Sequence, residues 1–547
     1  MAEPRVVIVG AGPAGLTAAL ELVRAGRPPI VLDLETQVGG ISRTIVHGGN
    51  RMDLGGHRFF SKSDWVMDWW REILPVESMP GDAPTRIAYR NQSRELAAAS
   101  RSDSPGSDRV MLVRPRVSRI YYLRKFFDYP IRLSPATLAN LGLGRTAAIG
   151  ASYLRSQVFP RAHERTLEDF LVNRFGQRLY RTFFKDYTEK VWGVPCTEIS
   201  AEWGAQRIKG LSIGRAVVHA VRSALRRGEG GTAQKATETS LIERFLYPKL
   251  GPGQLWEVVA ERIRAGGGEI RLSQRVTGIQ RDERTVRAVE VRDREGGTYR
   301  IDATHLISTM PIGELVRALA PAAPAEVRAV ADGLPYRDFM TAGLLVPRMT
   351  PPPGTPADAK TGMPPDNWIY VQEPEVRMGR IQIFNNWSPA MVASSPKIFL
   401  GLEYFCQDTD DLWSMPDDRF LSFAARELET IGLARAADVE DGVVVRVPKA
   451  YPAYFGSYER LDTVRRFAAT LSNLWLVGRN GMHRYNNQDH SMVSARMAVQ
   501  CILDPSRDRE AIWQVNLEQD YHEEDGGAAS RDSPYAVTPW QPSTRPP

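Results

Sequence analysis

The beginning of the chain alternates between two spacings of apolar positions that predict a strand, a helix and a second strand. The run Arg5–Gly10 (RVVIVG) has the length of a short buried strand, and Ala14–Ala25 has apolar residues at helical spacing. Pro29–Asp33 (PIVLD) is a second strand. Because a strand, a helix and a parallel strand form the unit of doubly wound sheets, the chain is predicted to begin with an α/β domain.

Later segments return to both spacings. Short apolar runs predict strands between Gly268 and Pro311, and Leu344–Val447 alternates strands with loops. Helical spacing dominates Ser134–Arg226 and recurs at Ser491–Leu503, directly after a strand predicted at Leu474–Val477. This order fits one α/β domain assembled from three separated segments of the chain, which a helical insertion and a sheet insertion interrupt.

Composition excludes some classes of protein. The 547 residues suffice for two or three domains, and a net charge of +6 is mild for this length. The sequence has no basic blocks that alternate with aromatic residues, so we predict no nucleic-acid partner. Cys196, Cys406 and Cys501 lie too far apart for a disulfide framework or metal cluster, so we expect no metal site and a reducing, cytoplasmic location.

No signal peptide and no apolar run of membrane-spanning length is visible, so stable membrane insertion is not expected. The stretch from Ala136 to Phe159 has two interpretations, a helix packed within a domain and an amphipathic helix on a membrane surface. The packed helix is the favoured interpretation. The sequence gives no prediction of oligomeric state.

A glycine motif joins the first strand to the first helix. GAGPAG places Gly10, Gly12 and Gly15 where a dinucleotide fingerprint needs a tight turn, a close backbone approach to a pyrophosphate and helix–strand packing. Asp33 ends the second strand, where a carboxylate can accept hydrogen bonds from ribose hydroxyls. The combination predicts a cofactor that contains ADP, whereas glycines alone would also suit a structural turn.

A second glycine motif favours FAD over NAD. GGISRT, at Gly39–Thr44, resembles the second glycine motif of the glutathione-reductase-like flavoproteins, in which backbone and side-chain groups meet the diphosphate. The resemblance assigns cofactor contacts to Gly40, Ser42 and Arg43. It also places Val276 where backbone touches adenine. Transient hydride donation by an external nicotinamide such as NADPH stays open.

These motifs lead to a predicted α/β fold with a Rossmann-like FAD-binding domain, an inserted helical domain and an antiparallel β-sheet substrate domain. Met79–Asp108, rich in Ser, Pro, Asp and Gly, is expected to be a mobile insertion. The predicted division is residues 1–75, 250–320 and 465–505 for the FAD domain, 110–249 for the mainly helical domain, 321–464 for the antiparallel sheet, and 506–547 for a largely disordered tail.

A histidine follows two glycines in DLGGHRFF, Asp53–Phe60. Gly55 and Gly56 would allow the backbone to approach a flat ring closely, which would place His57 against a flavin. The alternative is a loop histidine that is merely hydrogen-bonded.

Motifs spread from Arg5 to Ile502 resemble the flavin-dependent UDP-galactopyranose mutases, especially the eukaryotic-type branch. Their order and co-occurrence are specific, although each alone is not. The motifs are GGHRFF after Leu54, EKVWGVP (Glu189–Pro195), WGAQR (Trp203–Arg207), LISTM (Leu306–Met310), WIY (Trp368–Tyr370), GRIQIFNNWSP (Gly379–Pro389), AYP (Ala450–Pro452) and GRNGMHRYNNQDHS (Gly478–Ser491).

The resemblance implies a role for each matching residue. His57 matches a mobile histidine loop beside the isoalloxazine, Arg207 and Arg380 match arginines that grip the sugar-nucleotide diphosphate, and Arg479 matches an arginine near flavin and sugar. The remaining matches are Tyr370, Tyr451 and Tyr485 on the diphosphate, Trp192 at the sugar, Tyr129 at uracil, and Asn487 and Gln488 at the pyrimidine edge of the flavin.

The implied activity is a non-redox ring contraction of a nucleotide-diphosphate sugar through an adduct between the sugar and N5 of the reduced flavin. Arginine suits this chemistry because its planar fork binds diphosphate oxygens in a bidentate manner. One position departs from the family, because Arg132 stands where a glutamine accompanies uracil, so the nucleotide base stays open. The alternative function is an FAD-dependent oxidoreductase that resembles amine oxidases or protoporphyrinogen oxidase, with Tyr451 and Tyr485 as an aromatic cage for an amine.

Overall fold

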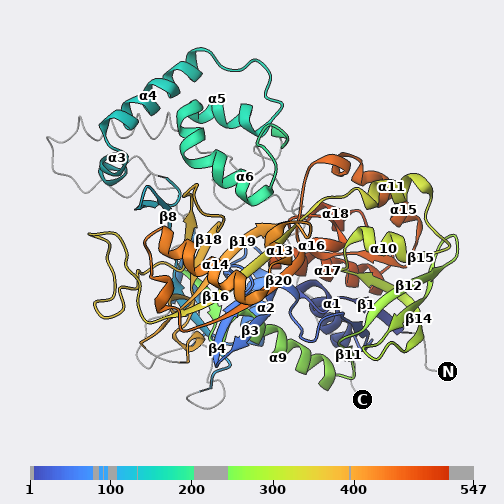
Figure 1. Ribbon diagram of the computed structural model, residues 1–547. Coiled ribbons are helices and arrows are strands. Elements are labelled where there is room, and N and C mark those ends of the chain that lie inside the picture. Colours follow the sequence, from blue (N-terminus) through green and yellow to red (C-terminus); the bar gives the residue numbers. More distant parts are fainter. Residues whose placement is uncertain are drawn as a thin grey trace.

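The computed structural model describes residues 5–77, 85–89, 92–96, 107–131, 134–201, 244–393 and 396–515. Two large sheets and a group of helices make up this part of the chain, with the helices α3 to α6 at the top of the view (Figure 1). The predicted α/β class is confirmed.

The first sheet contains the strands that the apolar pattern predicted. β1 (Arg5–Val9) lies between β2 (Ile30–Leu32) and β14 (Thr298–Ser308), and both pairings are parallel. Helix α1 (Pro13–Arg24) follows β1 and packs against α17 (Gln488–Leu503). The other strands of this sheet are β11 (Glu269–Arg271), β12 (Arg275–Arg281), β13 (Val286–Arg292), β15 (Leu319–Ala320) and β21 (Leu474–Leu476).

Helices cover this sheet and complete the first domain core. The apolar side chains of α1 and of α9 (Pro252–Ala265) are buried in the same cluster as β1 and β14. Other helices of this core are α17, α2 (Asp64–Ile73), α10 (Ile312–Ala318), α11 (Ala325–Asp332), α15 (Leu461–Thr470) and α18 (Ala511–Gln514).

The second sheet is mixed rather than purely antiparallel. Its strand order is β20 (Asp441–Pro452), β16 (Tyr336–Val346), β19 (Ile398–Cys406), β18 (Arg380–Ile383), β17 (Trp368–Val371), β8 (Ser118–Tyr122) and β9 (Lys125–Asp128). The pairing of β17 with β8 is parallel, and the others are antiparallel. The predicted antiparallel sheet therefore receives two strands from a segment that we expected to be helical.

Segment 110–249, which we predicted to be mainly helical, has helices as most of its described secondary structure, and it also has strands that we did not predict. It begins with β7 (Met111–Pro115), β8 and β9, and the structure describes β10 (Arg244–Pro248) at its end. These strands were not predicted because short strands that pair with distant strands satisfy their backbone groups through partners that local periodicity does not reveal. Residues 202–243 lie outside the described part of the chain.

The described helices of this segment form a lobe. They are α3 (Pro135–Leu141), α4 (Leu143–Val158), α5 (Leu167–Tyr180) and α6 (Asp186–Trp192), with a π-helical turn between the last two. Gly176 in α5 has φ of 79°, and a Cβ there would lie 2.8 Å from the backbone nitrogen of Tyr153 in α4. The two helices therefore pack closely enough at this point to require glycine.

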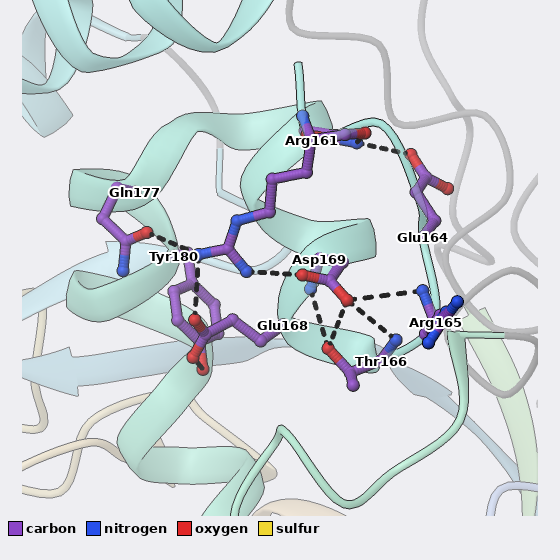
Figure 2. A network of polar contacts seen from close by, with 9 residues as sticks. Arg161, Glu164, Arg165, Thr166, Glu168, Asp169, Gln177 and Tyr180 are labelled. Atoms are coloured by element: carbon purple, nitrogen blue, oxygen red, sulfur yellow. Dashed lines mark hydrogen bonds and ion pairs between the residues drawn. The ribbon is translucent and has the colours of Figure 1, made fainter. Parts of the chain in front are cut away.

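Polar contacts fix the connection between α4 and α5 (Figure 2). Arg161 donates to Asp169 at 2.6 Å and to Glu168 at 3.0 Å. Thr166 is the N-cap of α5, and its hydroxyl accepts from the backbone N–H of Asp169 at 3.2 Å. The network holds the start of α5, which leads to α6 and Trp192.

The first residues of the predicted tail are structured. Residues 506–515, predicted as part of a disordered tail, include α18, whose Trp513 is 9% exposed. The guanidinium of Arg484 donates to the carbonyls of Trp513 and Val515, which holds this segment on the domain. The large apolar side chain of Trp513 was the feature of the sequence that indicated a packed segment here. Residues 516–547 lie outside the described part, as does most of the insertion predicted at Met79–Asp108, apart from β5 (Thr85–Tyr89) and β6 (Gln92–Leu96).

The remaining elements complete the described chain. They are β3 (Thr44–His47), β4 (Asn50–Asp53), α12 (Phe384–Trp387), α13 (Asp411–Ser414), α14 (Asp417–Thr430) and α16 (Gly478–Gly481), together with short 3-10 turns. No helix of the described residues is both long and apolar enough to cross a bilayer.

Candidate active site

The two glycine motifs lie face to face. Helix α1 begins after Gly12, which caps it without a side chain, and the backbone N–H of Gly39 donates to the carbonyl of Ala11 at 2.8 Å. A Cβ on Gly40 would lie 3.1 Å from Cα of Gly12. Side chains at these positions would fill the space between the motifs, so the glycines keep open a cradle whose walls are backbone. The N-terminal N–H groups of α1 face it, as a diphosphate requires.

The first and third glycines have packing roles. Gly10 has φ of 104°, which favours glycine, and a Cβ on Gly15 would lie 1.8 Å from the carbonyl oxygen of Gly10. These contacts press α1 against the end of β1.

Asp33 lies at the end of β2, as predicted. Its two carboxylate oxygens accept from the backbone N–H of Ala11 at 2.5 Å and of Glu35 at 2.8 Å, and burial raises its pKa. The backbone N–H of Gln274 donates to the carbonyl of Asp33 at 2.8 Å, which brings the strand that carries Val276 beside it. The carboxylate retains lone pairs for ribose hydroxyls, and the strand of Val276 lies at the same end of the cradle.

The second motif is held by its own arginine. Arg43 donates to the carbonyl of Gly40 at 3.0 Å, approaches Glu35 to 3.5 Å and is 8% exposed. Ser42 is also buried. The side chain of Arg43 thus stabilises the turn that shapes the cradle.

The segment from Arg484 to Ser491 connects several parts of the site. Asn487 is the N-cap residue of α17, and its backbone N–H donates to Nδ1 of His490 at 3.3 Å. The side-chain oxygen of Gln488 accepts from the indole N–H of Trp256 at 3.0 Å, and Asp489 accepts from the Ser61 hydroxyl at 2.8 Å. These bonds fix the loop against α9 and the segment after His57. Contacts of Asn487 and Gln488 with a flavin stay a prediction.

The histidine loop lies beside the aromatic residues of the second sheet. Gly55 has φ of 91°, and a Cβ there would lie 3.9 Å from the hydroxyl of Tyr451. A Cβ on Gly56 would lie 2.9 Å from the Trp368 ring. Burial, aided by the charge of Arg479, lowers the pKa of His57 to about 4. His57 is therefore neutral at neutral pH.

Arg479 lies against two stacked tyrosines. The rings of Tyr451 and Tyr485 have centroids 5.5 Å apart and an interplanar angle of 16°, and the guanidinium carbon lies 5.4 Å and 4.8 Å from those centroids. The same guanidinium donates to the carbonyls of Ala450 and Asn486, each at 3.0 Å. Cation–π contacts and backbone acceptors therefore fix this charge at the site.

Arg380 has a mixed aromatic and acidic surrounding. Its Nε donates to the hydroxyl of Tyr187 at 2.6 Å, and its Nη1 lies 3.4 Å from Oε2 of Glu403. The guanidinium carbon is 4.9 Å from the ring centroids of both Trp368 and Phe405. The side chain is 13% exposed, so this positive charge is held in a largely dehydrated position.

A second pair of tyrosines extends the site toward the helical lobe. Tyr129 stacks on Tyr370 with ring centroids 4.4 Å apart, and Trp192 lies 6.5 Å from Tyr485. Arg380 connects the two pairs, because its guanidinium carbon lies 5.8 Å from the Tyr370 ring and packs on Phe405, whose ring centroid is 5.7 Å from that of Tyr451. Burial raises the pKa of the Tyr451 phenol. The predicted residues that the structure brings together form the tyrosine–arginine cluster: Tyr129, Trp192, Tyr370, Arg380, Tyr451, Arg479 and Tyr485.

Two predicted site residues, Arg132 and Arg207, lie outside the described residues. Three others were not predicted: Tyr187 and Glu403, which contact Arg380, and Lys190. Glu403 faces Arg380 across paired strands β18 and β19, and it is fully buried. Cross-strand pairing leaves no signal in a single sequence, so only the register reveals this partner.

Lys190 holds the two walls of the cluster together. Its ammonium donates to the carbonyls of Glu373 and Met378, both at 3.1 Å, and lies 3.4 Å from that of Val371. Burial lowers its pKa to about 8, so the group remains charged at neutral pH. Lys190 therefore joins α6 to the turn between the strands of Tyr370 and Arg380.

The described residues contain no group of three or more His, Cys, Asp or Glu that could hold a metal ion. The site thus comprises a glycine-lined backbone cradle, a neutral histidine and two guanidinium groups among tyrosines. The cradle and Asp33 fit the diphosphate and ribose of FAD, whereas the place of His57 beside the isoalloxazine stays a prediction.

Solved structures with this fold include a reduced UDP-galactopyranose mutase and a putrescine oxidase bound to putrescine. The mutase is 20% identical with a TM-score of 0.72, over 95% of this chain and 99% of the mutase. The oxidase is 14% identical with a TM-score of 0.54, over 91% of this chain and 99% of the oxidase. At these identities the similarity shows the fold alone.

Curated relatives match over shorter segments. Phytoene dehydrogenase of Streptomyces griseus is 26% identical over 341 residues, which cover 59% of this chain and 58% of the relative. Putrescine oxidase of Kocuria rosea is 48% identical over 74 residues, 14% of each chain. The matched segments therefore cover less than two thirds of these relatives.

The fold and the cradle define a flavoprotein that uses FAD, which confirms the predicted cofactor. Residues 13–503 match the model of the flavin-containing amine oxidoreductases. The chain belongs to that family and is a flavin-dependent enzyme of the amine oxidase superfamily.

Proposed function

We propose that this enzyme is a flavin-dependent pyranose–furanose mutase that acts on a nucleotide-diphosphate sugar. The observation that carries the proposal is that two guanidinium groups lie close to Tyr451, beside the loop of His57. Arg479 packs on the Tyr451 ring, and Arg380 packs on Phe405, whose ring centroid is 5.7 Å from that of Tyr451. Two fixed cations among phenols suit an anionic substrate with several oxygen acceptors. The mutase resemblance of the motifs and the fold similarity support the same choice.

The arginines would contribute by binding the diphosphate of the substrate and then stabilising it as a leaving group. A charge-assisted hydrogen bond contributes about 1.5–3 kcal/mol net, and a group that meets developing charge lowers the barrier. Glu403 is fully buried behind Arg380 and 3.4 Å from it, so it orients the guanidinium from the side remote from solvent.

The tyrosine hydroxyls and His57 would supply uncharged hydrogen-bond partners for the substrate. Burial raises the pKa of Tyr451, so its hydroxyl is a donor at neutral pH. His57, with its pKa lowered to about 4, can accept or donate one hydrogen bond without adding charge. Bound FAD, once reduced by an external donor such as NADPH, would supply the nucleophile for the anomeric carbon.

Amine oxidation is the alternative, because the family and a putrescine oxidase relative favour it. An amine substrate needs space between aromatic rings and no competing cation. Here the Tyr451 and Tyr485 centroids are 5.5 Å apart, and the guanidinium carbon of Arg479 is 4.8 Å from one of them. Repulsion by Arg479 therefore argues against an ammonium substrate at this position.

The test compares the two reactions in one preparation. Dithionite-reduced holoenzyme is incubated anaerobically with UDP-galactose and with GDP-, CDP- and dTDP-sugars, and furanose products are separated by chromatography. We expect a furanose product from at least one nucleotide sugar and none from the oxidised enzyme. Oxygen consumption and peroxide release with putrescine or other amines, without furanose, would establish the alternative.

A further inference from the structure

Helix α4 has an apolar stripe on its outer side. Leu143, Ala147, Ala151, Leu154 and Val158 follow one another at spacings of three or four residues, which place them on one face of a helix. All five are exposed, Leu143 at 90%, Leu154 at 65% and Val158 at 67%. A solvent-facing helix ordinarily has polar residues on this face.

The inner face of α4 already has its partner. Ser156 is buried, Ile149 packs on the core of the lobe, and the helix contacts α5. Figure 1 shows α4 at the upper margin of the molecule, with α5 beside it. The apolar stripe therefore points away from the described body of the protein.

Exposed apolar side chains concentrate at this margin. Of the eight large apolar side chains that are exposed among the described residues, five belong to α3, α4 and the C-cap of α4. They are Leu138, Leu143, Leu154, Val158 and Phe159. Such a concentration marks an interaction surface rather than ordinary scatter.

The segment around α4 has basic residues and no acidic ones. Residues 129–163 contain no Asp or Glu. Arg145 and Arg155 are exposed and form no ion pair with a described residue, whereas Arg161 is neutralised by Glu168 and Asp169. Arg155 follows Leu154 directly and flanks the apolar stripe, whereas Arg145 lies two residues after Leu143 and so on the other side of the helix.

We propose that α4 lies on the surface of a bilayer that contains anionic lipid, with its apolar stripe at the level of the acyl chains. An exposed apolar helix face flanked by an arginine, in a segment without acidic residues, is the pattern of helices that bind in the interface without crossing it. A second copy fits less well, because its α4 segment has the same positive charge and no acidic residue to complement it. This surface lies outside the tyrosine–arginine cluster, so the proposal does not depend on the substrate.

The experiment is sedimentation of full-length holoenzyme with vesicles of phosphatidylcholine alone and with phosphatidylglycerol added. We expect binding to the anionic vesicles that is at least 10-fold stronger than to the neutral ones and that weakens at high salt. The double variant Leu154→Glu, Val158→Glu should reduce binding at least 10-fold. Leu503→Glu, at another exposed leucine (44%), is the matched control and should bind like the unaltered enzyme.

Flavin absorbance and thermal unfolding of each variant establish that it is folded. Absence of vesicle binding by the unaltered enzyme would overturn the proposal, as would equal binding by the double variant. Dimers that dissociate in the double variant, without vesicle binding, would assign the stripe to a second copy and likewise overturn it.

Discussion

At the scale of single residues, the site depends on how charges are held in a largely dehydrated position. Arg380 has a buried carboxylate behind it, and Arg479 has backbone carbonyls and two phenol rings. Each guanidinium is therefore pre-oriented, so that little rotational freedom is lost when a diphosphate binds. Both arginines were predicted site residues, whereas Tyr187 and Glu403, which orient Arg380, were not.

Arg380→Lys should weaken binding of the nucleotide sugar roughly 10- to 100-fold and leave FAD bound. Lysine keeps the charge but loses the planar fork and the bond to Tyr187, and a factor of ten corresponds to about 1.4 kcal/mol. Calorimetric titration of the reduced enzyme with the active nucleotide sugar measures the change.

The matched control is Arg377→Lys, three residues earlier, where the arginine pairs with exposed Asp411 at 2.9 Å. It should bind the nucleotide sugar like the unaltered enzyme. Unchanged affinity in Arg380→Lys would remove Arg380 from the substrate site.

At the scale of elements, glycines decide how closely backbones approach. Gly12 and Gly40 keep the cofactor cradle open, and Gly176 lets α5 pack on α4. The sequence predicted the first two from a motif. Gly176 carries no motif, because its role depends on a helix pair that forms only in the folded lobe.

Gly176→Ala should lower the free energy of unfolding by at least about 2 kcal/mol. The φ of 79° is strained for alanine, and its Cβ would lie 2.8 Å from the backbone of α4, so both terms act in the same direction. Thermal unfolding of the holoenzyme measures the effect.

Gly150→Ala in α4 is the control with the opposite sign. No atom lies within 4 Å of a Cβ there, and alanine in a helix interior is more stable than glycine by about 0.5–1 kcal/mol. A Gly176→Ala enzyme as stable as the unaltered one would show that the two helices separate at no cost.

At the scale of the whole molecule, a buried histidine between the first domain and the second sheet makes the stability of the fold depend on pH. His483 follows α16 of the first domain. Its Nε2 lies 3.2 Å from the carbonyl oxygen of Ala453, which follows β20 of the second sheet. It is fully buried, and burial lowers its pKa to about 4. The unfolded chain therefore binds this proton more readily than the folded enzyme.

The stability advantage of the unaltered enzyme over His483→Gln should shrink by about 3 kcal/mol as the pH falls from 7 to 4. The histidine contributes fully above its unfolded pKa of about 6.5, and its contribution is lost as the pH approaches 4. Glutamine does not titrate but can still donate to Ala453.

Denaturant unfolding of both proteins across this pH range measures the difference. If the difference in stability between the two proteins stayed constant with pH, the pKa of His483 would be the same in the folded enzyme and in the unfolded chain, and the prediction would be wrong. The pH dependence of other groups cancels, because both proteins share them.

Local order in the sequence determined the first domain. The β-α-β pattern was predicted correctly because its signal is local periodicity, and with the two glycine motifs it led to FAD, which the family match confirms. The cofactor contacts of the glycines and of Asp33 stay predictions. Distant pairings were decided only by the tertiary structure: β8 joins β17, Arg380 meets Glu403, and the outer face of α4 has no described partner. Such contacts form between segments far apart along the chain, where periodicity carries no information about the partner, and packing energy alone selects them.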